Sequence, residues 1–578
     1  MSSTTSLSII ENTRLQSQES IVMGGEGMSM INGGHLVARA LKQEGVKYIF
    51  TLCGASILPI YEGCVDKGIE VIDVRHEQAA GFAAQAWAKI TGDPGVAVAT
   101  AGPGVTNLTT AVANAFRDSI PMIAIGGRTP FTQWDMDPPQ DLDHVAHMRP
   151  ITKWARSVLE TSRIPEYLSM AFRQAIGPKP GPVFLEIPEN VLQAQMDEAE
   201  VRFPSHYRPI VGPQGDPDLI EQAVKLLSQA EKPVVLAGGS IWWSQAHHEL
   251  QRFIELSDTP IFLVGMGRGS VPYGHRLLFN YARRFALTQA DVIAVLGTPI
   301  DFRLGYGQPP LFSSKAKVIQ VDFEPEDIGH NRAVEIGIYG DMKAILKQLS
   351  RQTEKSESIH RDKWVEKVRG EELKSEKDQE PLLNSEAVPI HPLRLCKEIR
   401  DFIDEDATII GDGGDFISFS ARALRIYHPG HWLDPGRFGS LGAGPGSAIA
   451  ARLARPSKQI LLLSGDGSFG LSGMEFDTMV RKQLPIVCVI SNDAMWGQTK
   501  TYFQSAGKTP IGVDLGRATR YDKLVESLGG YGELVEKPDE IRPALHRAFT
   551  SGLPACLNVV TSSEVFYGAR SYKAYEAK

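Results

Sequence analysis

The chain has 578 residues, which is too many for one compact core and predicts three or four domains of about 150 residues each. Its formal net charge of −8 argues against a nucleic-acid-binding surface, and no apolar run reaches the roughly 18 residues that span a bilayer. The five cysteines are scattered and form no CxxC pair, so neither a disulfide framework nor a zinc site is expected.

The two ends of the chain differ from the rest in composition. Residues 1–28 are rich in Ser, Thr, Gln and Glu and lack the basic and apolar regions of a secretory signal, so we interpret them as a disordered extension. Residues 566–578 are aromatic and basic, and we expect either a lid over a binding site or a frayed end. Neither end carries a recognisable targeting signal, so the expected location is the cytoplasm.

The first folded block, residues 29–201, alternates helical and strand patterns. Helical patterns cover residues 34–44 and, in an Ala-rich segment, residues 78–91. Short apolar runs predict strands at residues 48–52, 71–74, 95–100 and 121–125. Continuous apolar strands separated by helices predict a parallel sheet that is covered on both faces.

Two further blocks repeat this alternation. The central block, residues 202–352, has predicted strands at residues 233–239, 260–264, 291–297 and 317–322. Residues 353–388 are charged, and a helix followed by an exposed linker is expected there. The third block, residues 389–565, has predicted strands at residues 408–412, 460–464, 485–490 and 555–560. The sequence thus predicts an α/β protein of three doubly wound parallel-sheet domains.

A glycine-rich turn follows one of the predicted strands of the third block. Gly465, Asp466 and Gly467 come directly after an apolar run and precede a helix expected at about Met474. Glycines let the backbone approach a phosphate closely, and Asp466 offers a hard oxygen ligand to Mg²⁺ or Ca²⁺. Gly-Asp-Gly turns are common in loops, so the tripeptide alone is a weak signal.

The next predicted strand ends in a second polar group, Asn492 and Asp493. Adjacent parallel strands end at the same edge of a sheet, so Asp466 and Asp493 could hold one cation between two strand tips. The alternative, that Asn492 and Asp493 only begin a turn, stays open for the isolated motif.

Together these residues resemble the cofactor motif of thiamine-diphosphate-dependent enzymes, in which a Gly-Asp-Gly, a helix, an apolar strand and an Asn pair follow one another. In that family the Asp, the second residue of the pair and a backbone carbonyl two residues later bind the metal. Carried over, the ligands of a Mg²⁺ ion are Asp466, Asp493 and the carbonyl of Met495. Asp493 replaces the commoner Asn, and its charge beside a diphosphate is expected to weaken or retune cofactor affinity.

The first block carries the other half of this resemblance. Glu77 follows a predicted strand and opens the Ala-rich helix, in a segment that resembles the one whose catalytic Glu contacts the aminopyrimidine ring of the cofactor. In isolation Glu77 would more often be a carboxylate that favours a helix start. In the family, the Glu-bearing domain of one subunit meets the metal-bearing domain of another. The resemblance therefore implies a homodimer or homotetramer with the active site at the subunit interface.

Further segments resemble other parts of the family's cofactor site. Leu441 resembles the wedge that bends the cofactor into a V shape, although alone it would be an ordinary core leucine. The other residues that the resemblance assigns to the cofactor are Gly414, Asp415, Gly439, Gly467, Ser468, Asp493, Met495 and Trp496. The family's fold has an N-terminal pyrimidine-binding domain, a Rossmann-like central domain and a C-terminal diphosphate-binding domain, which we assign to the three blocks.

The domain order matches the branch that contains acetolactate synthase, 2-hydroxyacyl-CoA lyase and benzaldehyde lyase. Benzaldehyde lyase has an active-site glutamine in the segment that matches residues 139–143, which makes Gln140 a catalytic and substrate-binding candidate. It has a histidine where this chain has Ser56, a second substrate-side candidate, and this departure argues against simple aromatic acyloin chemistry. Gln498, just past the metal pair, is also expected to face the substrate.

The activity that we predict first is the cleavage of a 2-hydroxyacyl-CoA into formyl-CoA and an aldehyde or ketone, or the reverse condensation. Arg268 and Arg303, in loops of the central block, are candidate contacts for CoA or for ADP, against the alternative of ordinary surface arginines. Whether the central domain binds ADP, FAD or neither stays open. The competing predictions are a carboligase of the acetolactate synthase type, acting on 2-oxo acids, and a non-catalytic subunit, which the presence of Glu77 and Asp466 argues against.

Overall fold

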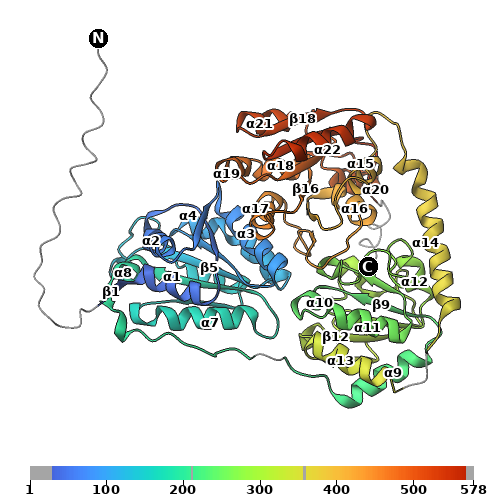
Figure 1. Cartoon of the computed structure of the whole chain (residues 1–578), viewed down its shortest axis with the longest axis horizontal. Coiled ribbons are helices and arrows are strands. Elements are labelled where there is room, and N and C mark those ends of the chain that lie inside the picture. The colour runs from blue at the N-terminus through green and yellow to red at the C-terminus, as the bar shows by residue number, and fades with distance from the viewer. Residues whose placement is uncertain (1–28, 210–211, 356–358, 568–578) are drawn as a thin grey trace, which may run out of the picture.

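The computed structural model describes residues 29–209, 212–355 and 359–567. The predictions for residues 1–28, and for the tail from residue 568 onward, lie outside this part of the chain. Three α/β lobes make up the described chain, each built on its own parallel sheet, and this confirms the predicted fold class (Figure 1). Among the described residues, every helix is too short or too polar to cross a membrane.

The N-terminal domain has a six-stranded parallel sheet in the order β3-β2-β4-β5-β7-β6. Its strands are β2 (Tyr48–Thr51), β3 (Glu70–Asp73), β4 (Gly95–Ala99), β5 (Met122–Arg128), β6 (Trp154–Ser157) and β7 (Pro182–Pro188). Its helices are α1 (Gly33–Gln43), α2 (Leu58–Asp66), α3 (Glu77–Thr91), α4 (Pro103–Asn107), α5 (Thr109–Arg117), α6 (His144–Met148), α7 (Ile164–Ile176) and α8 (Glu189–Gln193). A short antiparallel pair, β1 (Met30–Asn32) with β8 (Gln195–Asp197), joins the two ends of the domain.

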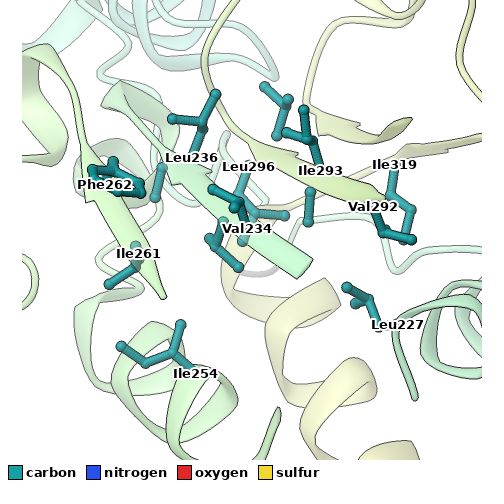
Figure 2. Close-up of a cluster of buried hydrophobic side chains, with 14 of the residues drawn as sticks. Leu227, Val234, Leu236, Ile254, Ile261, Phe262, Val292, Ile293, Leu296 and Ile319 are labelled. Carbon is teal, nitrogen blue, oxygen red and sulfur yellow. The ribbon is translucent and has the colours of Figure 1, made fainter. Parts of the chain in front are cut away.

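The central domain has a five-stranded parallel sheet in the order β10-β9-β11-β12-β13. Its strands are β9 (Pro233–Ala237), β10 (Ile261–Leu263), β11 (Val292–Leu296), β12 (Lys317–Asp322) and β13 (Ile336–Tyr339). Its helices are α9 (Pro217–Gln229), α10 (Gly239–Trp243), α11 (His247–Ser257), α12 (Arg283–Gln289) and α13 (Met342–Thr353). Figure 2 shows the apolar core of this domain. Val234 and Leu236 of β9 lie between residues of the neighbouring strands β10 and β11, and Ile254 of α11 belongs to the same core. These apolar runs are continuous because helices cover both faces of the parallel sheet and bury the strands completely.

The C-terminal domain repeats a six-stranded parallel sheet, in the order β15-β14-β16-β17-β19-β18. Its strands are β14 (Thr408–Asp412), β15 (Trp432–Leu433), β16 (Ile460–Gly465), β17 (Val487–Asn492), β18 (Tyr531–Val535) and β19 (Ala555–Val560). Its helices are α15 (Pro392–Arg400), α16 (Gly414–Ala423), α17 (Gly444–Ala454), α18 (Asp466–Ser472), α19 (Glu475–Arg481), α20 (Gly497–Ser505), α21 (Tyr521–Ser527) and α22 (Ile541–Thr550).

A long helix, α14 (Asp362–Leu383), leads from the central domain to the C-terminal domain along one side of the molecule (Figure 1). It occupies most of the segment in which a helix and a linker were expected. The predicted boundaries between the domains stay predictions.

The N-terminal and C-terminal domains of the chain meet through α3 and α17. The two helices pack so closely that a Cβ atom on Gly446 would lie 2.5 Å from the backbone oxygen of Ala79, which only glycine avoids. This contact places the start of α3, where Glu77 lies, beside the C-terminal domain.

Candidate active site

Two neighbouring strands of the C-terminal sheet end side by side at the predicted metal residues. The parallel pairing of β16 with β17 ends with Gly465 opposite Ser491. Asp466 follows the first strand directly, and Asp493 follows the second, so both carboxylates lie at one edge of the sheet. The helix expected at about Met474 is confirmed as α19, which has Met474 as its N-cap, whereas the short helix α18, which begins at Asp466, was not predicted. Its glycine-rich sequence has low intrinsic helix propensity and therefore gave no helical signal.

A cavity of about 140 Å³ opens at this edge of the sheet. The predicted residues that line it are Gly414, Asp415, Leu441, Asp466, Gly467, Ser468, Asp493, Met495, Trp496 and Gln498. Among the residues of the C-terminal domain assigned to the cofactor, Gly439 is the exception, since it lies exposed in the loop before Leu441 and is not part of the cavity wall. The structure thus gathers one predicted group from segments far apart in the sequence.

Close packing around this cavity requires glycine at two positions. Gly413 has a φ of +81°, and a Cβ atom there would lie 2.5 Å from the Cβ of Ser468. A Cβ atom on Gly467 would lie 2.6 Å from the ring of Trp496. Bare backbone is open at Gly414 in the same wall, where a Cβ atom would meet nothing within 4 Å, so the oxygens of a diphosphate can come close to the chain there.

Asp412 was not among the predicted residues, yet it organises the cavity from behind. Its fully buried carboxylate accepts hydrogen bonds from the N–H groups of Gly442 (3.1 Å) and Gly444 (2.9 Å) and from the hydroxyl of Ser468 (2.7 Å). These bonds tie the segment that contains Leu441 to α18. The available signal was an acidic residue at the end of an apolar run, the same signal that pointed to Asp466.

Three carboxylates crowd the cavity, and their pKa values show the cost of placing them there. Burial raises the pKa of Asp466 to about 6, and burial together with the charge of Asp466 raises the pKa of Asp493 to about 7. Burial also raises the pKa of Asp415 to about 6, and its Oδ2 atom has no hydrogen-bond partner among the described residues. A divalent cation would offset this repulsion, so the donor set fits Mg²⁺.

The turn after Asp493 leaves a backbone carbonyl available. Ala494 has a φ of +55°, an uncommon conformation for a residue with a side chain. The neighbouring backbone bonds run from Trp496 N–H to the Val513 carbonyl and from Leu515 N–H to the Ala494 carbonyl, and so leave out the carbonyl of Met495. Among the described residues no three acidic, His or Cys side chains are grouped to hold a metal alone. Two carboxylates and this carbonyl would need diphosphate oxygens or water to complete an octahedral shell.

Glu77 lies at the start of α3, at the corresponding edge of the N-terminal sheet. Its side chain is 5% exposed, and its Oε2 atom accepts a hydrogen bond of 2.9 Å from the amide of Asn107. Gly104 lies beside it and packs closely on the loop, since a Cβ atom there would lie 2.9 Å from Cγ2 of Thr100 and 3.5 Å from Oε1 of Glu77. Glu77 is not part of the wall of the cavity that its own chain forms around Asp466.

Ser56 and Gln140 surround the loop that follows β4. The Ser56 hydroxyl accepts a hydrogen bond from Ala101 N–H (3.1 Å) and is bonded to the Thr100 hydroxyl (2.9 Å). A Cβ atom on Gly102 would lie 2.8 Å from the carbonyl oxygen of Gln140, so the two backbones touch. The structure therefore brings Ser56 and Gln140 to the same sheet edge as Glu77, with the Ser56 hydroxyl already engaged by the fold.

The two predicted arginines of the central domain line different cavities. Arg303 lines a cavity of about 80 Å³ and forms an ion pair with Asp301 at 2.8 Å. Arg268 lines another of about 220 Å³, and its guanidinium donates a 2.7 Å hydrogen bond to the carbonyl of Ala421. Neither residue is part of the wall of the cavity around Asp466.

Glu475 of the C-terminal domain holds the turn that leads into Glu77. Its carboxylate accepts hydrogen bonds from the N–H groups of Arg75 (3.0 Å) and His76 (3.1 Å) and from the Thr478 hydroxyl (2.8 Å). The side chain is 1% exposed, and burial raises its pKa. This contact could not be predicted from sequence patterns, because the partners are about 400 residues apart in the chain.

Comparison with known proteins matches the three lobes in order. The matching family models are described as Thiamine pyrophosphate enzyme, with an N-terminal TPP binding domain at residues 31–147, a central domain at residues 220–349 and a C-terminal TPP binding domain at residues 412–559. The chain belongs to this family of thiamine pyrophosphate (thiamine diphosphate) enzymes, which confirms the resemblance seen in the sequence.

Two groups of relatives are similar over nearly the whole chain. The chain is 40% identical to the large subunit of acetolactate synthase from Mycobacterium tuberculosis, over 94% of this chain and 98% of the relative. It is 34% identical to 2-hydroxyacyl-CoA lyase 2 from Bos taurus, over 88% of this chain and 86% of the relative. It is also 32% identical to a probable acetolactate synthase large subunit from Methanocaldococcus jannaschii, over 92% of each chain. Sequence identity thus supports the alternative, acetolactate synthase, better than the lyase that was predicted first.

Proposed function

We propose that the protein is a carboligase of the acetolactate synthase type, which uses thiamine diphosphate and Mg²⁺ to join two 2-oxo acids with loss of CO₂. The observation that carries this proposal is the 40% identity to acetolactate synthase over 94% of the chain. The cavity around Asp466 supports it, because its bare backbone and crowded carboxylates suit a metal-bound diphosphate.

In this proposal Asp466, Asp493 and the Met495 carbonyl hold the metal, and Leu441 supports the cofactor between its two rings. When bound, thiamine diphosphate supplies a carbanion that adds to a carbonyl carbon and takes up the electrons left by the departing CO₂. Trp496 and Gln498, which line the same cavity, face the side where a substrate enters.

Glu77 completes the site from a second subunit, so the working unit is a homodimer or homotetramer. This is supported by the site that a single chain forms, which lacks one half of the cofactor-binding residues. The described residues that line the cavity around Asp466 all belong to the C-terminal domain, and Glu77 lies outside this cavity. Glu77 then holds and exchanges a proton with the aminopyrimidine ring of the cofactor, and Gln140, near the same sheet edge, contacts the substrate.

A second candidate is the cleavage of a 2-hydroxyacyl-CoA, supported by 34% identity to 2-hydroxyacyl-CoA lyase 2. Both reactions need the same cofactor site, so only substrates separate them. The purified protein with thiamine diphosphate and Mg²⁺ is given pyruvate in one reaction and a 2-hydroxyacyl-CoA in another. We expect acetolactate from the first; formyl-CoA from the second, without acetolactate from the first, would overturn the proposal in favour of the lyase.

For the central domain we propose that an ADP moiety, if one is bound, enters the cavity lined by Arg303 and not the one lined by Arg268. The first lies at the carboxyl ends of the central strands, with Gly297 and Asp322 in its wall, which is where parallel sheets bind ligands. Calorimetric titration with ADP tests this, and loss of binding in Arg303→Ala but not in Arg268→Ala is the expected result.

A further inference from the structure

The N-terminal domain contains a fully buried histidine that the proposed chemistry does not use. His144, at the start of α6, and Glu186, in β7, are both 0% exposed. The imidazole Nδ1 atom lies 2.8 Å from Glu186 Oε2, and its Nε2 atom lies 2.9 Å from the backbone nitrogen of Gly102. This buried pair therefore contacts, through His144, the loop that contains Gly102 and lies between Ser56, Gln140 and Glu77.

The bond to Gly102 fixes the state of the imidazole. A backbone N–H only donates, so Nε2 must accept and carries no proton. The ring proton then lies on Nδ1 and is donated to Glu186, whose Oε1 atom is bonded to the hydroxyl of Ser157 and lies 3.4 Å from the guanidinium of Arg128. His144 is thus neutral, with both nitrogens engaged and a single orientation.

Gly102 is connected through α4 to Glu77, the proposed catalytic residue. Gly102 precedes α4, a single helical turn closed by a bond from Thr106 N–H to the Gly102 carbonyl. The last residue of α4 is Asn107, which donates to Glu77 Oε2 at 2.9 Å. A shift of Gly102 therefore moves the hydrogen-bond donor of Glu77.

Glu186 also contacts the opposite side of this loop, where Gln140 lies, through Arg128. Arg128 forms an ion pair with Asp141 at 2.9 Å and lies 3.7 Å above the ring of Trp134. Asp141 directly follows Gln140, whose φ of +62° and backbone contact with Gly102 hold it in one uncommon conformation. Glu186 lies between these two arms, since it contacts both His144 and Arg128.

We propose that His144, held by Glu186, is a positioning residue that sets the Gly102 loop and through it the Asn107 donor of Glu77. The proposal rests on the assigned role of Glu77 towards the cofactor but not on the identity of the substrate.

Two substitutions at one position separate positioning from simple packing. His144→Gln can place an amide oxygen where Nε2 accepts from Gly102, whereas His144→Asn can place an amide nitrogen where Nδ1 donates to Glu186 but cannot reach Gly102. The readout is hydrogen–deuterium exchange at the thiazolium carbon of bound thiamine diphosphate, measured without substrate. Cofactor affinity is measured beside it by tryptophan fluorescence.

We expect His144→Asn to slow this exchange by about tenfold, the effect of one lost hydrogen bond, and His144→Gln to stay within about threefold of the wild type. Cofactor affinity should change by less than about twofold in both. Ser157→Ala, which removes a different bond to Glu186, should lower the unfolding temperature without slowing the exchange.

Equal exchange rates in the Asn and Gln variants, or exchange lost in step with the unfolding temperature across all three, would overturn the proposal and leave His144 a packing residue. Because no substrate is present, failure of the carboligase proposal would leave this result unchanged.

Discussion

The N-terminal and C-terminal domains share one strand order but present different chemistry at the edges of their sheets. Counted along the chain, both sheets run second, first, third, fourth, sixth, fifth. At the carboxyl ends of the C-terminal strands lie a glycine-walled cavity and three crowded carboxylates. At the matching edge of the N-terminal sheet lies the buried Glu77, supported by Asn107, and the second buried acid of this domain that we have described, Glu186, is paired with Arg128 and His144. One topology therefore serves two tasks, and the difference lies in the loops at the strand ends.

The largest effect is expected from Glu77, because in the proposed function it is the residue that exchanges a proton with the cofactor. Glu77→Gln keeps the size of the side chain and an acceptor for Asn107 but removes the exchangeable proton. Turnover should fall by about 10³-fold, the range of one general acid–base group. Calorimetry should show cofactor binding within a few-fold of the wild type; a variant that retains more than about a tenth of the activity would remove Glu77 from the mechanism.

Loss of a metal ligand from the C-terminal edge should act on binding rather than on turnover of loaded enzyme. Asp466→Ala should weaken Mg²⁺-dependent cofactor binding by about 100-fold or more, since it removes a direct ligand. Asp493→Asn is the matched control, because it keeps an oxygen ligand and relieves the repulsion from Asp466 and Asp415. Its affinity should equal or exceed that of the wild type. Equal weakening in both variants would contradict the assignment of Asp493 as a crowded but replaceable ligand.

Glu475 connects the two regions and should mainly affect stability. Glu475→Ala removes the acceptor of two backbone N–H groups and the buried side chain that connects the two domains, which should cost about 2–3 kcal/mol of unfolding free energy. Asp477→Asn, on the same helix but more exposed, should cost less than about 1 kcal/mol. Urea denaturation monitored by circular dichroism measures both, and a reversed order would show that Glu475 does not anchor the turn.

The smallest effect is expected away from both sheet edges. Burial lowers the pKa of His431, just before β15, to about 4, while its Nδ1 atom lies 3.1 Å from the Ala407 carbonyl. In the unfolded chain the pKa of this histidine is about 6.5. Between about pH 6.5 and about pH 4 the imidazole is therefore protonated in the unfolded state but stays neutral in the folded state. Stability should therefore fall as the pH falls from about 6.5 to about 4. His431→Gln should flatten that part of the curve of melting temperature against pH, with cofactor affinity unchanged.

Strands with uninterrupted apolar runs were predictable almost to the residue. Residues 317–322, 408–412 and 555–560 were expected as strands and are β12, β14 and β19. Their positions follow from burial on both faces, which a single sequence displays directly.

The elements that were missed depend on partners distant in the sequence. β7 begins with a proline and contains Glu186, a residue that is rare in a buried strand unless paired, as it is here with Arg128 and His144. The meeting of Asp466 and Asp493 could be expected from their strand-end positions, whereas Gly414 and Leu441 were expected to join them through the family resemblance. Asp412, Glu475 and His144 could not be assigned roles, because their hydrogen bonds join segments that only the folded chain brings together.

The hydrogen bonds between Glu475 and the turn before Glu77 have a consequence for the construction of hybrid enzymes. α19 also contacts this turn through Arg481, which pairs with Asp73 at 2.7 Å. A crossover that exchanges the N-terminal domain with that of a relative would separate residues 71–76 from residues 475–482 and break a matched set. Recombinants that inherit both segments from one parent should be recovered intact far more often than those that divide them, even though a full central domain separates the two in the gene.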